Sequence, residues 1–265
     1  FATIDSPIFA KPVFAKKGTT MTYCVGIRLK DGMIFASDTR TNAGVDQVSM
    51  FRKMYQYGIE GERFLVLQTA GNLATSQAVF TKLDNAIKLA QERNLHTVPT
   101  LYDAAQLVGE CLRETTIHAQ TIAQETDTKF RSSFILGGQI KGQSPEIYFI
   151  YPEGNCIRAT TDTPFFQLGE SKYGKPILDR SMNYDVSLKS AMRAILISFD
   201  STIRSNLSVG MPIDVLVYHN DSLQMPQGYR IDENDEYFAS IRQHWSDGLK
   251  KILAELEDSP VSYWQ

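Results

Sequence analysis

The sequence has few cysteines, no strong excess of charge and no long hydrophobic run. Its three cysteines, Cys24, Cys111 and Cys156, lie far apart, which argues against a disulfide framework and suits a reducing, cytoplasmic environment. The 27 Lys and Arg residues face 30 Asp and Glu residues, so neither nucleic acid nor an anionic membrane is an expected partner. No apolar run approaches the roughly 20 residues that cross a bilayer. With 43% apolar residues among 265, the chain can bury a sizeable core.

Common catalytic and metal-binding motifs are also missing. The sequence contains no GxSxG nucleophile elbow, no P-loop and no GxGxxG loop. Its histidines have no second ligand at metal-binding spacing, and each is better explained as an ordinary surface or helix residue. We therefore expect neither a metal nor another cofactor.

The first 21 residues differ in character from the rest of the chain. They contain two prolines, three lysines and a repeated Pro-x-Phe-Ala-Lys pattern. They lack the basic start and the unbroken apolar stretch of a secretory signal. We interpret residues 1–21 as a leader, a pro-segment or a cloning-derived extension, the alternative being a native arm that packs on the surface or on a neighbouring subunit. Residues 22–265 are then one domain with a C-terminal helix.

The period of the apolar residues changes along this domain. Val25, Ile27 and Leu29 alternate with other residues, and the Asp-Gly pair at 31–32 predicts a hairpin whose turn uses a positive φ. Helical spacing follows at 78–90 and 101–122, and strand patterns return between 133 and 168. A third helix is predicted at 188–203, a strand at 213–219 and a last helix at 238–256. This order favours a single α+β domain.

One set of residues carries chemistry: Thr22 starts the first predicted strand, Asp38 ends the second and Lys53 precedes the next. A threonine hydroxyl is a weak nucleophile unless a base lies beside it. The α-amine of an N-terminal threonine, with a pKa of about 8, is such a base. A nearby lysine lowers the pKa of the hydroxyl, and an aspartate holds the lysine. Because Met21 precedes Thr22, we predict that removal of residues 1–21 is required for activity.

The sequence around these residues resembles proteasome-type β-subunits, which are N-terminal-nucleophile hydrolases. The likeness covers nearly the whole body, and its clearest stretches are TYCVGIRLKDGMIFASDTRTNAG, FRKMYQY and TAG. Within that superfamily, three stretches resemble the bacterial Anbu (ancestral β-subunit) group: SDTRTNAG, LGESKYGKPILDRS and STIRSNLSVGMPID. The resemblance implies a four-layer αββα sandwich of two antiparallel sheets flanked by helices.

The resemblance also implies roles for single residues. Thr22 would be the nucleophile, Lys53 and Asp38 would activate it, and the backbone N–H of Gly71 would bind the oxyanion. The S1 pocket, which holds the substrate residue before the scissile bond, would lie near four residues: Thr41, Asn42, Lys53 and Met54.

The turn close to the nucleophile departs from the family pattern. The family has Gly-Ser-Gly there, and the serine supports the threonine amine. This sequence has Gly-Glu-Ser at 169–171, so either Ser171 takes that role or Glu170 replaces it.

A second departure lies further along the chain, where the family has an aspartate three residues before a second serine. Ser208 matches that serine, but Ser205 or Asn206 stands in the place of the aspartate. The expected catalytic set is therefore Thr22, Asp38, Lys53, Gly71, Ser171 and Ser208.

We expect a threonine-type endopeptidase that acts on peptides or unfolded proteins. The resemblance implies self-association into a closed ring or an open helical assembly, and it leaves open whether an ATP-dependent unfoldase is a partner. One alternative is an N-terminal-nucleophile amidohydrolase for a non-peptide amide. Another is a weakly active assembly subunit, which would have no need to keep Thr22, Asp38 and Lys53 together.

Overall fold

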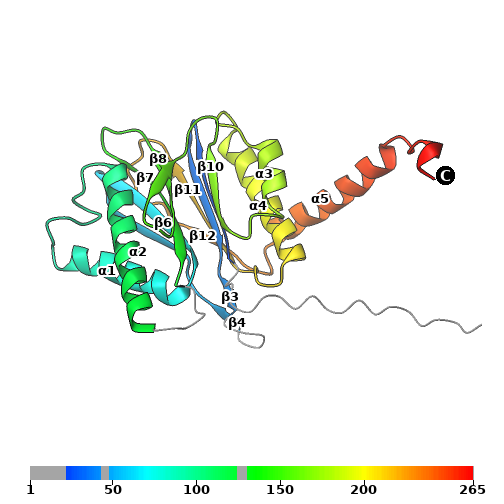
Figure 1. Cartoon of the computed structure of the whole chain (residues 1–265). Helices are drawn as coiled ribbons and strands as arrows, with labels where there is room; N and C mark the ends of the chain where they lie inside the picture. The colour runs from blue at the N-terminus through cyan, green and yellow to red at the C-terminus, as the bar shows by residue number, and fades with distance from the viewer. Residues whose placement is uncertain (1–21, 43–47, 124–129, 265) are drawn as a thin grey trace, which may run out of the picture.

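The computed structural model describes residues 22–42, 48–123 and 130–264. Two five-stranded antiparallel sheets lie face to face, and a two-stranded ribbon extends from them (Figure 1). The first sheet has the order β10-β1-β2-β11-β12 and consists of β10 (Phe165–Gly169), β1 (Tyr23–Leu29), β2 (Gly32–Asp38), β11 (Ile213–His219) and β12 (Tyr229–Ile231). The second has the order β5-β6-β7-β8-β9 and consists of β5 (Met54–Ile59), β6 (Arg63–Gly71), β7 (Ser132–Ile140), β8 (Glu146–Ile150) and β9 (Cys156–Arg158). The ribbon pairs β3 (Arg40–Asn42) with β4 (Val48–Met50).

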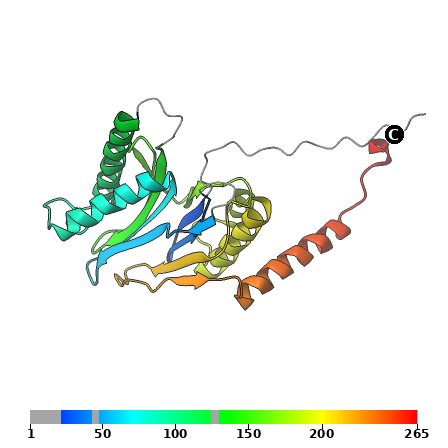
Figure 2. The same ribbon diagram turned by 90° about the horizontal axis from the view of Figure 1, so that it is seen from below.

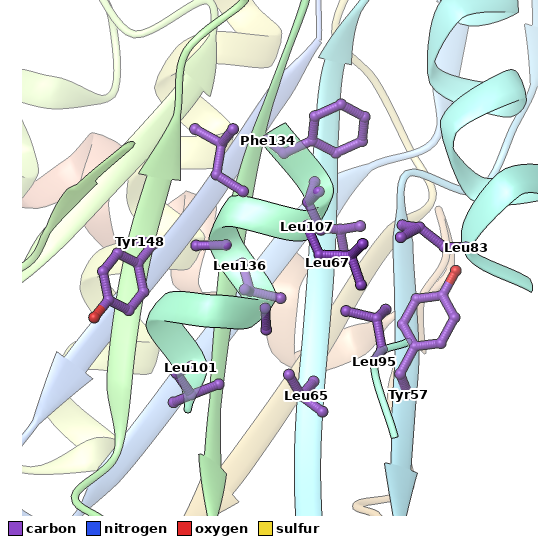
Figure 3. Close-up of a cluster of buried hydrophobic side chains, with 14 of the residues drawn as sticks. Tyr57, Leu65, Leu67, Leu83, Leu95, Leu101, Leu107, Phe134, Leu136 and Tyr148 are labelled. Atoms are coloured by element: carbon purple, nitrogen blue, oxygen red, sulfur yellow. The ribbon is translucent and has the colours of Figure 1, made fainter. Parts of the chain in front are cut away.

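Helices cover the outer face of each sheet (Figure 1). The second sheet carries α1 (Leu73–Lys88) and α2 (Leu101–Ala123), and the first carries α3 (Lys175–Ser181) and α4 (Leu188–Ser205). One apolar core lies under α1 and α2 (Figure 3), a second lies under α4, and a third fills the space between the sheets. The expected αββα sandwich is confirmed.

The β1–β2 hairpin is confirmed, but the predicted reason for it is wrong. Its two-residue loop is Lys30-Asp31, and neither of these residues nor Gly32 has a positive φ. Gly32 instead begins β2 beside β11, where an added Cβ would lie 2.2 Å from the carbonyl oxygen of Tyr218. The glycine is needed for a close approach between strands, not for the turn.

Capping residues mark where the helices begin. The side chain of Asn72 caps α1 by accepting a hydrogen bond from the N–H of Thr75 at 3.0 Å. Four short elements were not predicted, namely β3, β4, β12 and the seven-residue α3. They are too short for an apolar period to become visible, and α3 also begins with a proline in its first turn.

The last helix, α5 (Glu236–Glu255), starts against α4 and then leaves the body (Figures 1 and 2). Phe238 is its one buried residue among those the structure describes. A short 3₁₀ turn (Val261–Tyr263) follows. None of the described helices is long and apolar enough to cross a membrane.

Candidate active site

Thr22 lies at one end of the first sheet, directly before β1. Because β1 is flanked by β2 on one side and by β10 on the other, Thr22 has two distinct flanks. The residue is 3% exposed. The β2 flank holds Asp38 and Lys53, and the β10 flank holds Gly169 and Glu170.

The β2 flank contains a buried ion pair. The ammonium group of Lys53 donates to Asp38 Oδ1 at 2.7 Å and also to the carbonyl oxygen of Arg40. The same Asp38 oxygen accepts the backbone N–H of Tyr23 at 3.0 Å, which ties the ion pair to the residue after Thr22. Asp38 is 0% exposed and Lys53 is 4% exposed. The structure therefore brings Asp38, at the end of one strand, and Lys53, directly before another, close to the backbone beside Thr22.

Burial and charge act in opposite directions on this carboxylate. Burial raises the pKa of Asp38 above its usual value, and the charge and hydrogen bond of Lys53 pull that pKa down. The backbone N–H groups of Tyr23 and Gly210 also lower it. The pair is held in a dry environment, where an unpartnered charge on either residue would be costly.

The ammonium group of Lys53 has three protons, and two of them are donated to Asp38 and Arg40. Among the described residues the third proton has no acceptor. A lysine that is fixed at two points in this way can offer its remaining proton to an oxygen beside it.

Cys24 also lies close to this ion pair, but it is not a competing nucleophile. Its thiol is completely buried between the sheets and donates to the carbonyl oxygen of Thr69 at 3.6 Å. Burial raises the pKa of Cys24, and the charge of Lys53 opposes that rise only in part. The thiol therefore stays protonated, and a protonated thiol is unreactive.

The β10 flank is built from backbone contacts and one carboxylate. The N–H of Glu170 donates to the carbonyl oxygen of Thr22 at 2.7 Å. The Glu170 carboxylate is buried, accepting from the N–H of Lys172 at 3.2 Å and from Asn206 Nδ2 at 3.1 Å. Asn206 Oδ1 in turn accepts the N–H of Ser208 at 2.9 Å.

These contacts bear on the two departures from the family pattern. The backbone N–H of Glu170 is hydrogen-bonded to the backbone of Thr22, and the side chain of Asn206, not that of Ser205, is hydrogen-bonded to the Glu170 carboxylate. Ser171 instead lines a neighbouring cavity and accepts the N–H of Lys175 through its carbonyl oxygen. The family resemblance pointed to these positions, but it could not tell which of them are hydrogen-bonded to each other.

Gly71 ends β6 in the second sheet and lines the same hollow as Gly169. Its φ is 121°, and an added Cβ would lie 2.4 Å from the carbonyl oxygen of Arg131. The position therefore demands glycine.

A chain of buried hydroxyl groups fixes the backbone around Gly71. Thr69 Oγ1 lies 2.7 Å from Ser76 Oγ, which donates to Ser132 Oγ at 3.1 Å. Ser132 Oγ donates to the carbonyl oxygen of Asn72 at 3.0 Å. These bonds join the end of β6 to α1 and β7, so the N–H of Gly71 is held by rigid elements. This series of hydrogen-bonded hydroxyl groups was not predicted from the sequence, because its members look like ordinary strand and helix residues.

Comparison with known proteins agrees with this geometry. The proteasome subunit family matches residues 15–218. Among curated relatives, a proteasome subunit beta of Haloquadratum walsbyi is 24% identical over 223 residues, which cover 82% of this chain and 80% of that protein. The fold is that of N-terminal-nucleophile hydrolases of the proteasome type.

Solved structures of Anbu proteins are more similar still. The structure titled a helical assembly of the Anbu complex from Pseudomonas aeruginosa is 55% identical, with a TM-score of 0.88, and the match covers 91% of this chain and 100% of that one. Anbu from Yersinia bercovieri is 50% identical, with a TM-score of 0.84 and coverage of 90% and 99%. The chain belongs to the proteasome subunit family and, within it, to the Anbu (ancestral β-subunit) group.

Proposed function

We propose that this protein is a threonine-type endopeptidase whose nucleophile is Thr22 once residues 1–21 are removed. The observation that carries the proposal is the buried Lys53–Asp38 ion pair, which is hydrogen-bonded to the backbone of Tyr23 and so sits directly beside Thr22. A buried ion pair stabilises a fold poorly, because desolvation offsets its attraction. Its presence next to a candidate nucleophile favours a role in chemistry.

In the proposed reaction, Thr22 Oγ attacks the peptide carbonyl carbon and the free α-amine of Thr22 takes the hydroxyl proton. Lys53 lowers the pKa of the hydroxyl, and Asp38 holds Lys53. The N–H of Gly71 donates to the oxyanion, an interaction worth roughly 3–4 kcal/mol in other hydrolases. The intermediate then expels the leaving amine, which receives the proton. Water hydrolyses the resulting ester and regenerates Thr22.

The test uses chains that begin at Thr22, produced by starting translation at Met21 and removing it with an aminopeptidase. We expect the trimmed chain to cleave peptides and a threonine-directed epoxyketone to label Thr22, as located by mass spectrometry. The chain that keeps residues 1–21 should do neither.

The matched variants are Thr22→Ala, which removes the hydroxyl, and Thr22→Ser, which keeps one. Thr22→Ala should abolish turnover with an unchanged circular dichroism spectrum, and Thr22→Ser should retain part of it. Peptide cleavage by the Thr22→Ala variant, or a label on any other residue, would refute the proposal. Cleavage of non-peptide amides alone would replace it by a different amidohydrolase activity.

We also propose that the protein works as a homo-oligomer. Four apolar residues recur at helical spacing on the projecting part of α5 and at its C-cap, and they are between 43% and 68% exposed: Leu249, Ile252, Leu253 and the C-cap residue Leu256. Such a stripe is normally covered by a partner. A second copy of this chain fits it, because the similar Pseudomonas aeruginosa protein is described as a helical assembly. Light scattering on the trimmed preparation should give a particle several times heavier than one chain.

A further inference from the structure

A groove runs away from Thr22 on its β10 flank. Two cavities of about 340 and 510 Å³ share Phe149 and Gln167 in their walls and so adjoin each other. Gly71 and Gly169 line the near cavity, and Lys175 of α3 lines the far one. An added Cβ at Gly169 would lie 1.7 Å from the carbonyl oxygen of Thr22, so the groove begins directly beside the proposed nucleophile.

The groove lies between two strands that are each at the edge of a sheet. β10 is the edge strand of the first sheet, and β9 is the edge strand of the second. Within the described part of the chain, neither has a second strand partner. An edge strand presents free backbone donors and acceptors to which an extended peptide can add as a further strand.

The wall of the groove includes a cluster of aromatic and aliphatic side chains. The ring of Phe149 lies 4.8 Å from that of Tyr151 and 5.7 Å from that of Phe166, measured between centroids. Ile157 of β9 also lines the wall and is 45% exposed. An exposed aliphatic side chain beside three aromatic rings is a surface that apolar side chains would bind.

The charged residues that line the groove balance each other, since Lys175 and Arg131 are positive and Asp162 and Asp179 are negative. Lys175 donates to Asp179 at 2.6 Å, and Arg131 at the near end is paired with Glu153. The groove therefore offers no strong preference for substrates of one charge, and burial of apolar side chains dominates its selectivity.

The direction of the groove indicates which half of a substrate it takes. Lys53, beside which the S1 pocket is expected, lies on the β2 flank of Thr22, whereas the groove leaves from the opposite, β10 flank. A peptide lying across Thr22 would then place the residues after the scissile bond in the groove. β10 has five residues, which at about 3.3 Å each span about 17 Å, enough for some five substrate residues.

We propose that this groove binds the segment that follows the scissile bond, as an extended strand along β10 with apolar or aromatic side chains packed on Phe149, Tyr151 and Ile157. The inference rests on the proposed function and deepens it, because it names the class of substrate. The preferred substrates are extended peptides with apolar residues after the scissile bond. The protein therefore selects its substrates by the segment that leaves after cleavage.

The experiment compares peptides that share one sequence before the scissile bond. The long substrate carries five residues after it, rich in Phe and Leu, a second long substrate carries Ser and Gly there, and a short one carries only a small fluorogenic amine. We expect the trimmed chain to cleave the apolar long peptide with a kcat/KM about tenfold higher than the Ser/Gly peptide. Ile157→Asp should remove that difference and leave the short substrate unaffected.

The matched control is Ile117→Asp on α2, which changes an isoleucine that is 56% exposed and does not line the groove. Equal kcat/KM values for the two long peptides, or an Ile157→Asp variant identical to the control, would overturn the inference and leave the proposed function standing. A fluorescently labelled apolar peptide is also titrated into the Thr22→Ala variant. If it binds there and Ile157→Asp abolishes the binding, while the trimmed wild-type chain cleaves nothing, the groove is supported and the proposed function fails.

Discussion

The two flanks of Thr22 are constructed differently. On the β2 flank, a fully buried ion pair is held by strands of both sheets, since Asp38 ends β2 and Lys53 directly precedes β5. On the β10 flank, the contacts come from a turn after β10 and from the end of α4, and a groove opens beside them. One flank is dry and rigid, and the other is more accessible.

This difference separates two tasks. A dry site strengthens the effect of a charge on a neighbouring hydroxyl, so activation of the Thr22 hydroxyl belongs on the β2 flank. A peptide needs an open surface with free backbone groups, so substrate binding belongs on the β10 flank. Substitutions on the first flank should therefore act on kcat, and substitutions on the second should act mainly through geometry or substrate affinity.

The largest effect is expected for Lys53→Met. The variant loses the group that lowers the pKa of the threonine hydroxyl, so kcat should fall by about a thousandfold. It also leaves Asp38 buried without a counter-charge, which should cost about 3–5 kcal/mol of folding free energy. Single-turnover kinetics and urea unfolding measure the two effects. The double variant Lys53→Met/Asp38→Asn should recover most of the stability and none of the activity.

The stability of the Lys53→Met variant should also depend on pH. Burial already raises the pKa of Asp38, and loss of Lys53 removes the main opposing influence. Because the pKa of Asp38 is higher in the folded state, the buried carboxyl lowers the folding stability least when it is protonated, below its unfolded pKa of about 3.9. The stability of the variant then falls as pH rises through the folded pKa. Unfolding at pH 5 should show a smaller deficit against wild type than unfolding at pH 8. A deficit that does not change with pH would contradict a buried, unpaired carboxylate.

An intermediate effect is expected for Gly169→Ala on the β10 flank. Its φ of 78° disfavours alanine, and the new Cβ would collide with the carbonyl oxygen of Thr22 at 1.7 Å. Displacing Thr22 by about 1 Å should lower kcat about a hundredfold. Gly142→Ala is the matched control, because Gly142 has a φ of 79° and no atom within 4 Å of the added Cβ. The control should lose about 1–3 kcal/mol of stability from strain alone and keep its activity.

The smallest effect is expected for Glu170→Gln, which keeps the shape of the side chain and removes its charge. A nearby carboxylate stabilises the ammonium form of the Thr22 amine and raises its pKa, so the charge delays the appearance of the neutral base as pH rises. The variant should shift the acid limb of the kcat profile to lower pH by up to about one unit, with less than a tenfold change in its maximum. Glu114→Gln on α2, an exposed carboxylate paired with Lys82, should leave the profile unchanged. A thousandfold loss for Glu170→Gln would mean that the β10 flank also activates the nucleophile.

Much of the fold could be predicted from the sequence, because its long elements have a clear period. The alternation from Val25 to Leu29 predicts β1, and the short β-branched run from Ile213 to His219 predicts β11. The pair of Thr22 and Asp38 could be placed at one sheet edge because a hairpin joins β1 to β2. The catalytic roles of these residues remain a prediction.

Contacts between distant segments could not be predicted. Glu170 and Asn206 are 36 residues apart on different elements, and nothing in either local pattern indicates that they are hydrogen-bonded. The same holds for the groove, whose walls come from β8, β9, β10 and α3. In the sequence, its aromatic lining residues cannot be distinguished from the aromatic residues that strands commonly contain.

The sequence by itself determined the order of strands and helices. It also determined the residue types directly before β1 and at the ends of β2 and β6. Local periodicity and side-chain chemistry suffice for this, since both act over a few neighbouring residues. Only the tertiary structure decided that Asp38 and Lys53 are buried, that the backbone of Glu170 is hydrogen-bonded to that of Thr22, and that β10 borders an open groove. Burial and pairing are properties of surfaces that meet only when the two sheets pack together, and no short stretch of sequence contains them.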